Sequence, residues 1–377
     1  MNVIFTCGGT GGHINPAIAV ANSFKERHPD ANILFVGAKG HMEEQLVPKA
    51  GFELKCLEVS GMRRGKSISS IMKNVKTVID TAKAVSQCKK LIREFKPDVI
   101  MGTGGYACFA ALMAGVQMKI PTCVHESNAM PGLTTRMLAG KVDKVLICFA
   151  ESAKRYKNPD NIEVVGMPIR REFVYADKTA ARKELGLGDG PVVVSAFGSL
   201  GARKMNEAVC ELLKLEQEAG YPFHHIHATG KYGWEWMPGK VRELGVDFEN
   251  CESVDMREYI YNMPTVMAAA DVIISRAGAS SCNEIAASGT PCILIPSPNV
   301  TDNHQEKNAR VLEGYGGAAV LLEKDCTAQR LYEEVNAILA DPQRSDAMAQ
   351  ALKKNVILDS AERICDIMEQ LASGTKN

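Results

Sequence analysis

Near its start the chain reads Val3-Ile4-Phe5-Thr6-Cys7-Gly8-Gly9-Thr10-Gly11-Gly12-His13, a strand-like run that leads into a glycine-rich turn. A second turn of this kind, Phe197-Gly198-Ser199-Leu200-Gly201-Ala202, follows Val192-Val193-Val194. A strand that feeds such a turn into a helix leaves backbone N–H groups unpaired at the positive helix end, which suits a phosphate. Two such turns predict two nucleotide-binding α/β domains that face each other across a cleft.

Length and composition narrow the classes of protein to which the chain can belong. At 377 residues it exceeds the size at which a single core stops growing, so two domains are expected. Lys plus Arg and Asp plus Glu number 44 each, so overall charge gives no reason to expect nucleic acid as a partner. The 12 cysteines contain no Cys-x-x-Cys pair, and there is neither a leader pattern nor an apolar run of about 18 residues. We therefore expect a soluble, intracellular protein with reduced thiols.

Short apolar runs alternate with longer helical patterns, which predicts parallel sheets with helices on both faces and an α/β fold class. The first series of expected strands is Asn2–Thr6, Ile33–Val36, Leu54–Val59, Val99–Met101, Thr122–His125 and Lys144–Ile147. The second series is Pro191–Ala196, His224–Ala228, Asp271–Ser275, Cys292–Ile295 and Ala318–Leu321.

The domain boundary is expected at Gly166-Met167-Pro168, because proline stops regular structure. This places an N-terminal domain at residues 1–165 and a C-terminal domain at residues 166–358. An amphipathic helix at about residues 360–373 follows and is expected to be able to pack back on the first domain.

A dinucleotide site is the first alternative for the turn at Gly8–Gly12. Such a site needs an acidic residue at the end of the second strand to bind ribose, but that strand ends Gly37-Ala38-Lys39. A P-loop would need Gly-Lys-Ser/Thr, which is absent. The glycines could also serve only a tight turn, although that would need less exposed backbone.

His13 follows the first turn, ahead of an expected helix at Pro16–Phe24. A histidine in this place can be a core or capping residue. The positive end of a helix disfavours the imidazolium form, so the ring is expected to be neutral and able to accept a proton.

The C-terminal half has polar groups after two expected strands. Glu284 lies one turn inside the helix that follows Ser275–Ser281, where its carboxylate can accept hydrogen bonds from a ribose diol or simply be solvated. Backbone N–H groups of Ala279, Ser280 and Ser281 can bind phosphate. The stretch Asp302–Asn308 follows a proline-rich loop, and its amide and imidazole groups suit sugar hydroxyls.

No metal is expected, because the chain has no Asp-x-Asp pair to hold a divalent ion beside a diphosphate. The run His224-His225-Ile226-His227 could ligate a metal. In a strand, however, only alternate side chains share a face, and no fourth ligand is evident.

Residues 62–96 combine basic residues with apolar residues at helical spacing. Only Asp80 and Glu94 oppose the positive charge. Such a helix can rest on an anionic membrane surface, or it can pack its apolar stripe on the sheet. The basic residues are Arg63, Arg64, Lys66, Lys73, Lys76, Lys83, Lys89, Lys90, Arg93 and Lys96, and the apolar ones are Ile68, Ile71, Met72, Val75 and Ile79.

These motifs, taken in order, resemble the MurG family of bacterial glycosyltransferases over most of the chain. The matching stretches are Gly8–His13, Lys96–Val99, Gly104–Tyr106, His125–Asn128, Gly132–Thr134, Val165–Arg170, Gly198–Arg203, Arg276–Ala279, Glu284–Ala286, His304-Gln305 and Asn308-Ala309. The resemblance implies a glycosyltransferase B fold of two Rossmann-like domains facing across a cleft. It also implies an inverting transfer of N-acetylglucosamine from UDP-GlcNAc to the muramyl C4 hydroxyl of undecaprenyl-linked lipid I, which makes lipid II for peptidoglycan. The enzyme would lie peripherally on the cytoplasmic face of the cell membrane and need no cofactor.

The resemblance also assigns roles to individual residues. His13 is the first choice for the catalytic base and Glu126 the second. The donor-binding residues are Thr10, Gly11, Gly12, Asn128, Arg170, Ser199, Ile260, Ala279, Ser280, Ser281, Glu284, His304 and Gln305. The acceptor-binding residues are Gly8, Gly9, Gly104, Gly105 and Tyr106.

Two alternative activities stay open at this point. One is another glycosyltransferase B enzyme with a lipid acceptor, such as diacylglycerol. The other is a UDP-GlcNAc 2-epimerase, which needs no acceptor.

Overall fold

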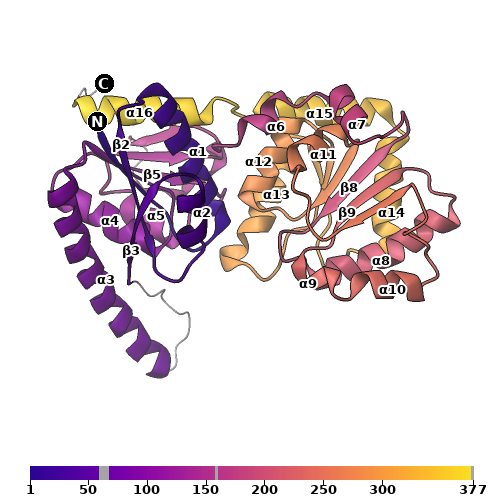
Figure 1. Cartoon of the computed structure of the whole chain (residues 1–377), viewed down its shortest axis with the longest axis horizontal. Helices are drawn as coiled ribbons and strands as arrows, with labels where there is room; N and C mark the ends of the chain where they lie inside the picture. Colours follow the sequence, from indigo (N-terminus) through magenta and orange to yellow (C-terminus); the bar gives the residue numbers. More distant parts are fainter. Residues whose placement is uncertain (59–67, 158–159, 375–377) are drawn as a thin grey trace. The chain divides into compact units, whose positions relative to one another are not determined.

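Each glycine-rich turn follows a central strand of its own parallel sheet. The computed structural model describes residues 1–58, 68–157 and 160–374, with backbone only for residues 68–79. Contacts divide the chain into unit 1, Met1–Ile169 with Ile357–Asn377, and unit 2, Arg170–Val356. The C-terminal segment therefore belongs to unit 1, although it follows unit 2 in the sequence (Figure 1).

The sheet of unit 1 has seven parallel strands in the order β3-β2-β1-β4-β5-β6-β7. Six of them match expected strands, with ends shifted by a few residues at most, and the short edge strand β7 was not predicted. The strands are β1 (Asn2–Thr6), β2 (Asn32–Ala38), β3 (Glu53–Leu57), β4 (Val99–Gly102), β5 (Thr122–Glu126), β6 (Lys144–Ile147) and β7 (Ile162–Val164).

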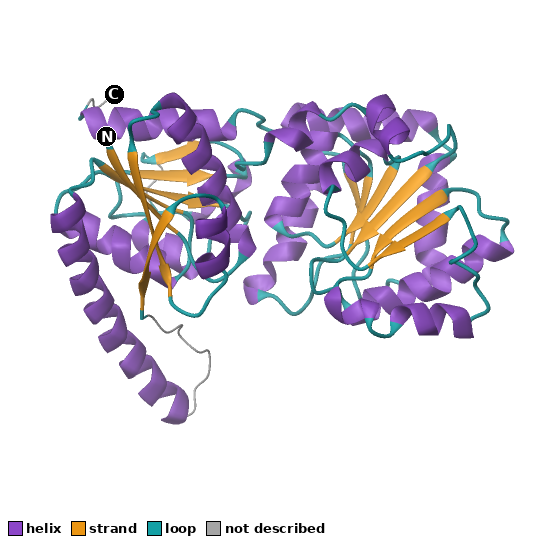
Figure 2. Cartoon of the chain, viewed as in Figure 1, coloured by secondary structure: helices purple, strands orange, loops and turns teal. Residues whose placement is uncertain are grey.

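Helices cover both faces of this sheet, as Figure 2 shows. Val3 and Phe5 of β1 point to the face covered by α1 and α16, whereas Ile4 points to the face covered by α3 and α4. This alternation follows from the two-residue period of a strand, and burial on both faces explains why β1 is apolar throughout. The helices are α1 (Gly11–Arg27), α2 (Glu43–Lys49), α3 (Ile68–Phe95), α4 (Tyr106–Gln117), α5 (Leu133–Leu138), η1 (Ala150–Arg155) and α16 (Ser360–Ser373).

Helix α1 begins at Gly11, earlier than the expected start at Pro16. The glycines at 11 and 12 are part of its first turn, so His13 lies inside the helix rather than before it. Helix α16 packs its buried Ile364 and Met368 in the same cluster as α1, and Asp366 pairs with Arg27 at 2.5 Å.

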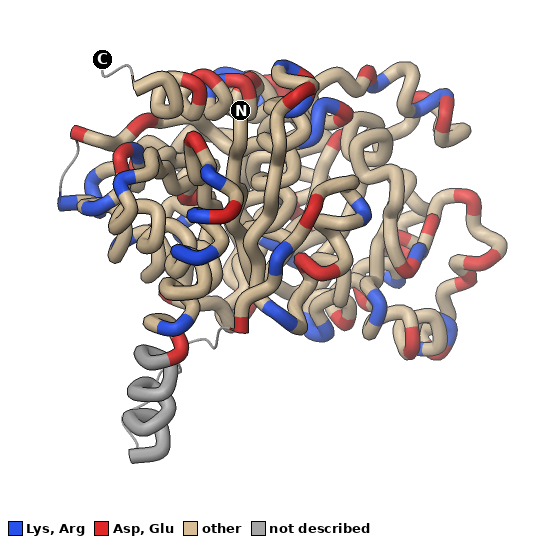
Figure 3. Tube along the Cα trace, turned by 60° about the vertical axis from the view of Figure 1, so that its left-hand side comes forward, with Lys and Arg blue, Asp and Glu red and all other residues tan. Residues whose placement is uncertain are grey.

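Helix α3 contains part of the basic segment. Arg63, Arg64 and Lys66, and the side chains of residues 68–79, lie outside the described residues. In the described part, Ala84, Cys88 and Ile92 are buried in the cluster shared with α4. The apolar side chains on which the packing alternative rests, Ile68 to Ile79, are among those not described. The basic side chains along the described part are exposed or half-buried, and Figure 3 shows their positions on the chain.

The sheet of unit 2 has six parallel strands in the order β10-β9-β8-β11-β12-β13. Two parallel sheets of Rossmann type confirm the expected α/β class. Strand β10, at one edge, was not predicted. The strands are β8 (Val192–Ala196), β9 (His224–Ala228), β10 (Val254–Arg257), β11 (Val272–Ser275), β12 (Cys292–Leu294) and β13 (Ala318–Val320).

The helices of unit 2 enclose this sheet. Leu212 and Leu213 of α8 and Val335 of α14 lie in one buried cluster with strand residues such as Ile274 and Ile293. The helices are α6 (Arg171–Tyr175), α7 (Lys178–Glu184), α8 (Arg203–Glu218), α9 (Lys231–Trp234), α10 (Met237–Glu243), α11 (Met263–Ala269), α12 (Ala279–Ser288), η2 (Thr301–Asn303), α13 (His304–Gly314), α14 (Ala328–Leu339) and α15 (Pro342–Asn355).

The histidine run of β9 forms a buried hydrogen-bonded chain within unit 2. His225 lies between Glu216 and Ser195: its Nδ1 is 2.8 Å from Glu216 Oε1 and its Nε2 is 2.7 Å from Ser195 Oγ. The same hydroxyl is 2.6 Å from Nδ1 of His227. All four side chains are fully buried, so this run cross-links two strands and α8.

We expect this chain of residues to make unit 2 sensitive to acid. Burial, aided by the nearby His225, lowers the pKa of His227 to about 3. The unfolded chain takes up a proton below its ordinary pKa of about 6.5, whereas the folded chain resists one, so stability is full above that pH and declines as pH falls. From this residue alone, unit 2 should lose about 2 kcal/mol at about pH 5.

Urea unfolding followed by tryptophan fluorescence measures this loss, because Trp234 and Trp236 both lie in unit 2. The neutral His227→Gln variant should lose less stability between neutral and acid pH than the wild type. A matched change at the exposed His41 should leave the wild-type loss intact. Equal losses in His227→Gln and the wild type would contradict the assignment.

Candidate functional site

The first glycine turn lies where the strand order of unit 1 reverses. Strands β1 and β4 are neighbours, yet the chain leaves β1 toward β2 on one side and leaves β4 toward β5 on the other. In open parallel sheets, ligands bind at the carboxyl ends of the strands at such a point. The turn after β1 and the turn Thr103–Gly105 after β4 flank this point.

The two turns pack directly against each other. A Cβ at Gly105 would stand 2.7 Å from the carbonyl oxygen of Gly8, and one at Gly104 would stand 2.9 Å from Nε2 of His13. Only glycine fits positions where a backbone or a ring approaches this closely. The expected acceptor-binding glycines and His13 therefore lie together, and Tyr106, which is 39% exposed, begins α4 beside them.

His13 is held in place by groups of both turns. Its Nδ1 is 3.0 Å from the carbonyl oxygen of Gly8, and Thr103 Oγ1 donates a 2.6 Å hydrogen bond to the His13 carbonyl. A carbonyl oxygen can only accept, so a proton on Nδ1 is required for that contact. The ring is half-buried, and this tautomer leaves the lone pair of Nε2 to accept a proton.

The N-terminus of α1 offers unpaired N–H groups next to His13. Thr10 is the N-cap residue, but its side chain makes no capping hydrogen bond. Thr10 and Gly12 are exposed and Gly11 is half-buried. The first N–H groups of a helix have no intrahelical acceptor, so this end is suited to an anion.

Gly9 differs from the neighbouring positions because its N–H points into the protein. It is 3.2 Å and 3.3 Å from the two carboxylate oxygens of Glu43. A ligand contact at Gly9 would therefore have to use another atom than this N–H.

The side chain of Glu126 is hydrogen-bonded to the loop that follows it in the sequence. It is 5% exposed, and its Oε1 accepts hydrogen bonds from the backbone N–H and the side-chain amide of Asn128, at 3.0 and 3.2 Å. Its Oε2 accepts one from the N–H of Gly132 at 2.8 Å. Both carboxylate oxygens of Glu126 therefore accept hydrogen bonds from its own loop.

The second glycine turn occupies the corresponding place in unit 2. Strand order reverses between β8 and β11, and the turns after them are Phe197–Ala202 and Arg276–Gly278. Ser199 is exposed in the first of these turns. Ala279 begins α12, with Ser280 and Ser281 half-buried behind it, so this helix directs its N-terminus to the same point.

Glu284 lies one turn inside α12 and is half-buried. Burial raises the pKa of its carboxyl, and the positive charge of Arg170 opposes that rise. The Arg170 guanidinium also stacks 4.9 Å from the ring centre of Phe173. Unit 2 therefore brings Glu284 and Arg170 together.

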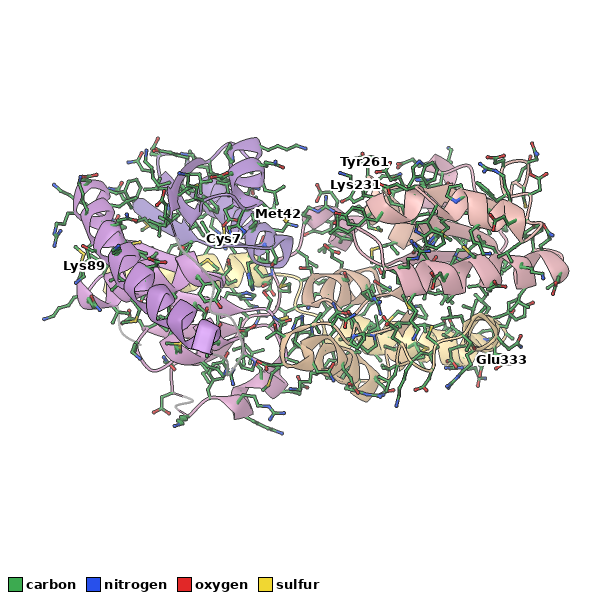
Figure 4. All side chains as sticks on the ribbon, turned by 90° about the horizontal axis from the view of Figure 1, so that it is seen from below. Cys7, Met42, Lys89, Lys231, Tyr261 and Glu333 are labelled. Atoms are coloured by element: carbon green, nitrogen blue, oxygen red, sulfur yellow. The ribbon has the colours of Figure 1, made fainter. Side chains whose placement is uncertain are left out.

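Ile260, expected at the uracil, has a buried side chain that is 2% exposed. Its neighbours Tyr259 and Tyr261 are 47% and 88% exposed, and their rings meet edge-on at 4.9 Å. Figure 4 shows Tyr261 and Lys231 at one end of unit 2. The segments that carry them are joined by a hydrogen bond from the Gly230 N–H to the Glu258 carbonyl oxygen. The residue expected to touch the base thus has its own side chain buried between two exposed tyrosines in the sequence.

His304 and Gln305 begin α13 after two residues with unusual backbone angles. Asp302 and Asn303 have φ values of 54° and 50°, in the left-handed region that few non-glycine residues adopt, Asn and Asp more often than others. His304 Nδ1 is 2.8 Å from the carbonyl oxygen of Thr301. Gln305 Oε1 accepts the N–H of Ser297 at 2.8 Å, which directs its amide NH₂ elsewhere for a ligand.

Comparisons with known proteins place the chain in a family. The N-terminal domain of glycosyltransferase family 28 matches residues 3–147, and its C-terminal domain matches residues 192–364. A UDP-N-acetylglucosamine--N-acetylmuramyl-(pentapeptide) pyrophosphoryl-undecaprenol N-acetylglucosamine transferase of Acetivibrio thermocellus is 40% identical over 372 residues, which cover 98% of each chain. The enzyme of that name from Bacillus cytotoxicus is 38% identical, over 98% of this chain and 99% of its own. The chain belongs to this transferase family, MurG.

Solved structures agree on the fold. MurG of Acinetobacter baumannii, 23% identical, has a TM-score of 0.77 and the match covers 98% of this chain and 99% of that one. A UDP-GlcNAc 2-epimerase from Neisseria meningitidis, bound to UDP-GlcNAc, is 15% identical with a TM-score of 0.67, over 98% of this chain and 100% of its own. Because an epimerase shares the fold, the fold alone does not separate the two activities.

Within the described residues, no group of three or more His, Cys, Asp or Glu side chains is placed to hold a metal ion. In the same residues, no helix has both the length and the apolar character needed to cross a membrane.

Glu43 is the site residue that sequence reasoning missed. In the sequence it reads as an ordinary acidic residue in the first turn of a helix, beside the exposed Glu44. The available signal was helical spacing: Glu43 and the apolar Val47 share the buried face of α2, where a carboxylate needs partners.

Proposed function

We propose that this MurG-family chain transfers N-acetylglucosamine from UDP-GlcNAc to the C4 hydroxyl of the muramyl sugar of lipid I, forming lipid II for peptidoglycan. The observation that carries the proposal is its 37–42% identity, along 98% of its length, to enzymes with that name. The geometry supports it, because unit 1 and unit 2 each have a helix N-terminus suited to a phosphate at a strand-order reversal.

The reaction is a single displacement that inverts the anomeric carbon. The acceptor C4 oxygen forms a bond to that carbon while the bond to the UDP oxygen breaks, and UDP leaves with the bonding electron pair. Nε2 of His13 takes the hydroxyl proton, since its Nδ1 is already directed to the carbonyl of Gly8.

Backbone groups and cations stabilise the phosphates in this proposal. The donor diphosphate lies at the N-terminus of α12 and the turn at Ser199, with Arg170 nearby, so charge that develops on UDP meets fixed dipoles. The acceptor diphosphate lies at Gly8-Gly9 and Gly104–Tyr106. The start of α1, with Thr10, Gly11 and Gly12, lies next to it and contacts the donor. The reaction then needs neither a metal nor a cofactor.

Transfer of labelled N-acetylglucosamine to a short-chain lipid I analogue tests the activity, with and without a chelator. Product in both reactions is the expected result. If UDP-GlcNAc is converted to its 2-epimer without any acceptor, the chain is an epimerase. If diacylglycerol accepts the sugar and the lipid I analogue does not, it is a different transferase. Loss of activity with chelator would refute the metal-free step.

Replacing His13 by Ala should lower turnover by about 100- to 10,000-fold, because general base catalysis is removed. Binding of UDP alone should not change, since Ser199, Ile260 and Glu284, proposed to hold the nucleotide, belong to unit 2 and His13 belongs to unit 1. Steady-state kinetics and a UDP titration measure the two quantities. His41→Ala, at an exposed histidine, is the matched control. Near-normal turnover in His13→Ala would place the base elsewhere, with Glu126 the next residue to test.

Replacing Glu284 by Gln should weaken UDP-GlcNAc binding by about 10- to 100-fold, because a carboxylate that accepts hydrogen bonds from the ribose is lost. The raised pKa of Glu284 adds a pH signature: affinity should fall as pH decreases below neutral, as the carboxylate becomes protonated. Calorimetric titration at several pH values measures both effects. Wild-type affinity in the variant, or an unchanged pH dependence, would rule out this role.

We also propose that the enzyme lies on the anionic cytoplasmic surface of the membrane, where its lipid-linked acceptor is found. The exposed Lys83, Lys90 and Arg93 of α3 support this, each such residue contributing about 1 kcal/mol near an anionic surface. Co-sedimentation with phosphatidylglycerol vesicles should be strong at low salt and weaker at high salt. Replacing these three residues by Gln should reduce it, and replacing the exposed Lys324, Lys353 and Lys354 of unit 2 should not. Wild-type protein that stays in the supernatant at low salt would contradict the proposal.

A further inference from the structure

We infer that Glu43 is a positioning residue that sets the shape of the turn at Gly8–Gly12 and, through it, the orientation of His13. No catalytic contact is assigned to Glu43 itself. The consequence for acceptor turnover rests on the proposed function, whereas the effect on the turn does not.

The carboxylate of Glu43 ties two segments together from inside the protein. It is fully buried, and its Oε1 accepts the N–H of Ala38, at the end of β2, at 2.8 Å. The N–H of Gly9 lies between both oxygens, at 3.2 and 3.3 Å. Hydrogen bonds to a buried carboxylate are stronger than neutral ones, and losing them leaves buried N–H groups unpaired.

The position of the Glu43 side chain is itself fixed by a glycine. A Cβ at Gly37, in β2, would stand 2.6 Å from Cγ of Glu43, so any larger residue there would displace the carboxylate's stem. Gly37 itself is not one of the donors to Glu43, which are Gly9 and Ala38. Substituting Gly37 is therefore a second way to displace the Glu43 side chain without changing the sequence of the turn.

The turn that Glu43 holds carries the partner of His13. Gly8 immediately precedes Gly9. The carbonyl oxygen of Gly8 accepts the hydrogen bond from Nδ1 of His13 and packs against Gly105. A shift of Gly9 would move this carbonyl, and with it the ring and the first N–H groups of α1. Small displacements at such a site reduce rates strongly. The residues proposed to hold the nucleotide, Ser199, Ile260 and Glu284, belong to the other unit.

The experiment compares Glu43→Ala, Glu43→Gln and Gly37→Ala with the wild type. The matched controls are Glu44→Ala and Glu44→Gln, because Glu44 lies in the same first turn of α2 but is exposed. They remove the same charge at the same helix end and leave the turn untouched. Circular dichroism at the assay temperature selects the variants that are folded.

We expect kcat/KM for the lipid-linked acceptor to fall by about 10- to 100-fold in Glu43→Ala and Gly37→Ala. Glu43→Gln should fall less, because its carbonyl oxygen can still accept from Ala38. Binding of UDP alone should stay within about two-fold in all variants, because Ser199, Ile260 and Glu284 belong to unit 2, and so should every parameter of the Glu44 controls. A folded Glu43→Ala with a wild-type acceptor kcat/KM, or with an equal loss of UDP binding, would overturn the inference.

Amide hydrogen exchange of the free protein keeps this test separate from the proposed activity. Exchange in the peptide that contains Gly8–Gly12 should be faster in both Glu43 variants and in Gly37→Ala, and unchanged in the Glu44 controls. If the wild type transferred no sugar, the proposed function would fail while faster exchange would still support the role of Glu43. Wild-type exchange in every variant would refute it.

Discussion

The contact between the turns after β1 and β4 is the constraint on which the site in unit 1 depends. The two turns meet backbone to backbone, because Gly105 lies where any side chain would collide with the Gly8 carbonyl. That contact needs two neighbouring parallel strands whose chains depart in opposite directions, a condition met only where the strand order reverses. The glycines therefore allow the two turns to come together.

Unit 2 uses the same architecture for a different set of side chains. Its turns after β8 and β11 again flank the strand-order reversal, but here they are accompanied by Glu284 and Arg170 rather than by a histidine. The two folds thus present similar backbone groups at their strand-order reversals. The side chains beside those groups differ, so the repeated fold alone does not determine the role of each unit.

Much of this could be read from the sequence, and the misses have physical causes. Strands buried on both faces are continuous apolar runs and were predicted, whereas the edge strands β7 and β10 contain charged residues because one side of each is open to water. In β10, Asp255 pairs with Arg257. Charged residues in so short a stretch are typical of a loop, so the pattern did not indicate a strand. Glu43 was missed for the opposite reason: its carboxylate is buried by backbone partners from distant segments, and sequence spacing does not show which N–H groups will meet.

The placement of Glu43 also shows how one turn can present donors in two directions. A buried carboxylate and a bound anion would compete if both used the same donors. The N–H of Gly9 points inward to Glu43, however, while the N-terminus of α1 directs its first N–H groups outward beside the exposed Thr10 and Gly12. In the proposed function, the outward N–H groups would bind the substrate and the buried carboxylate would fix the turn before that substrate arrives. This reduces the ordering that binding must otherwise bring about.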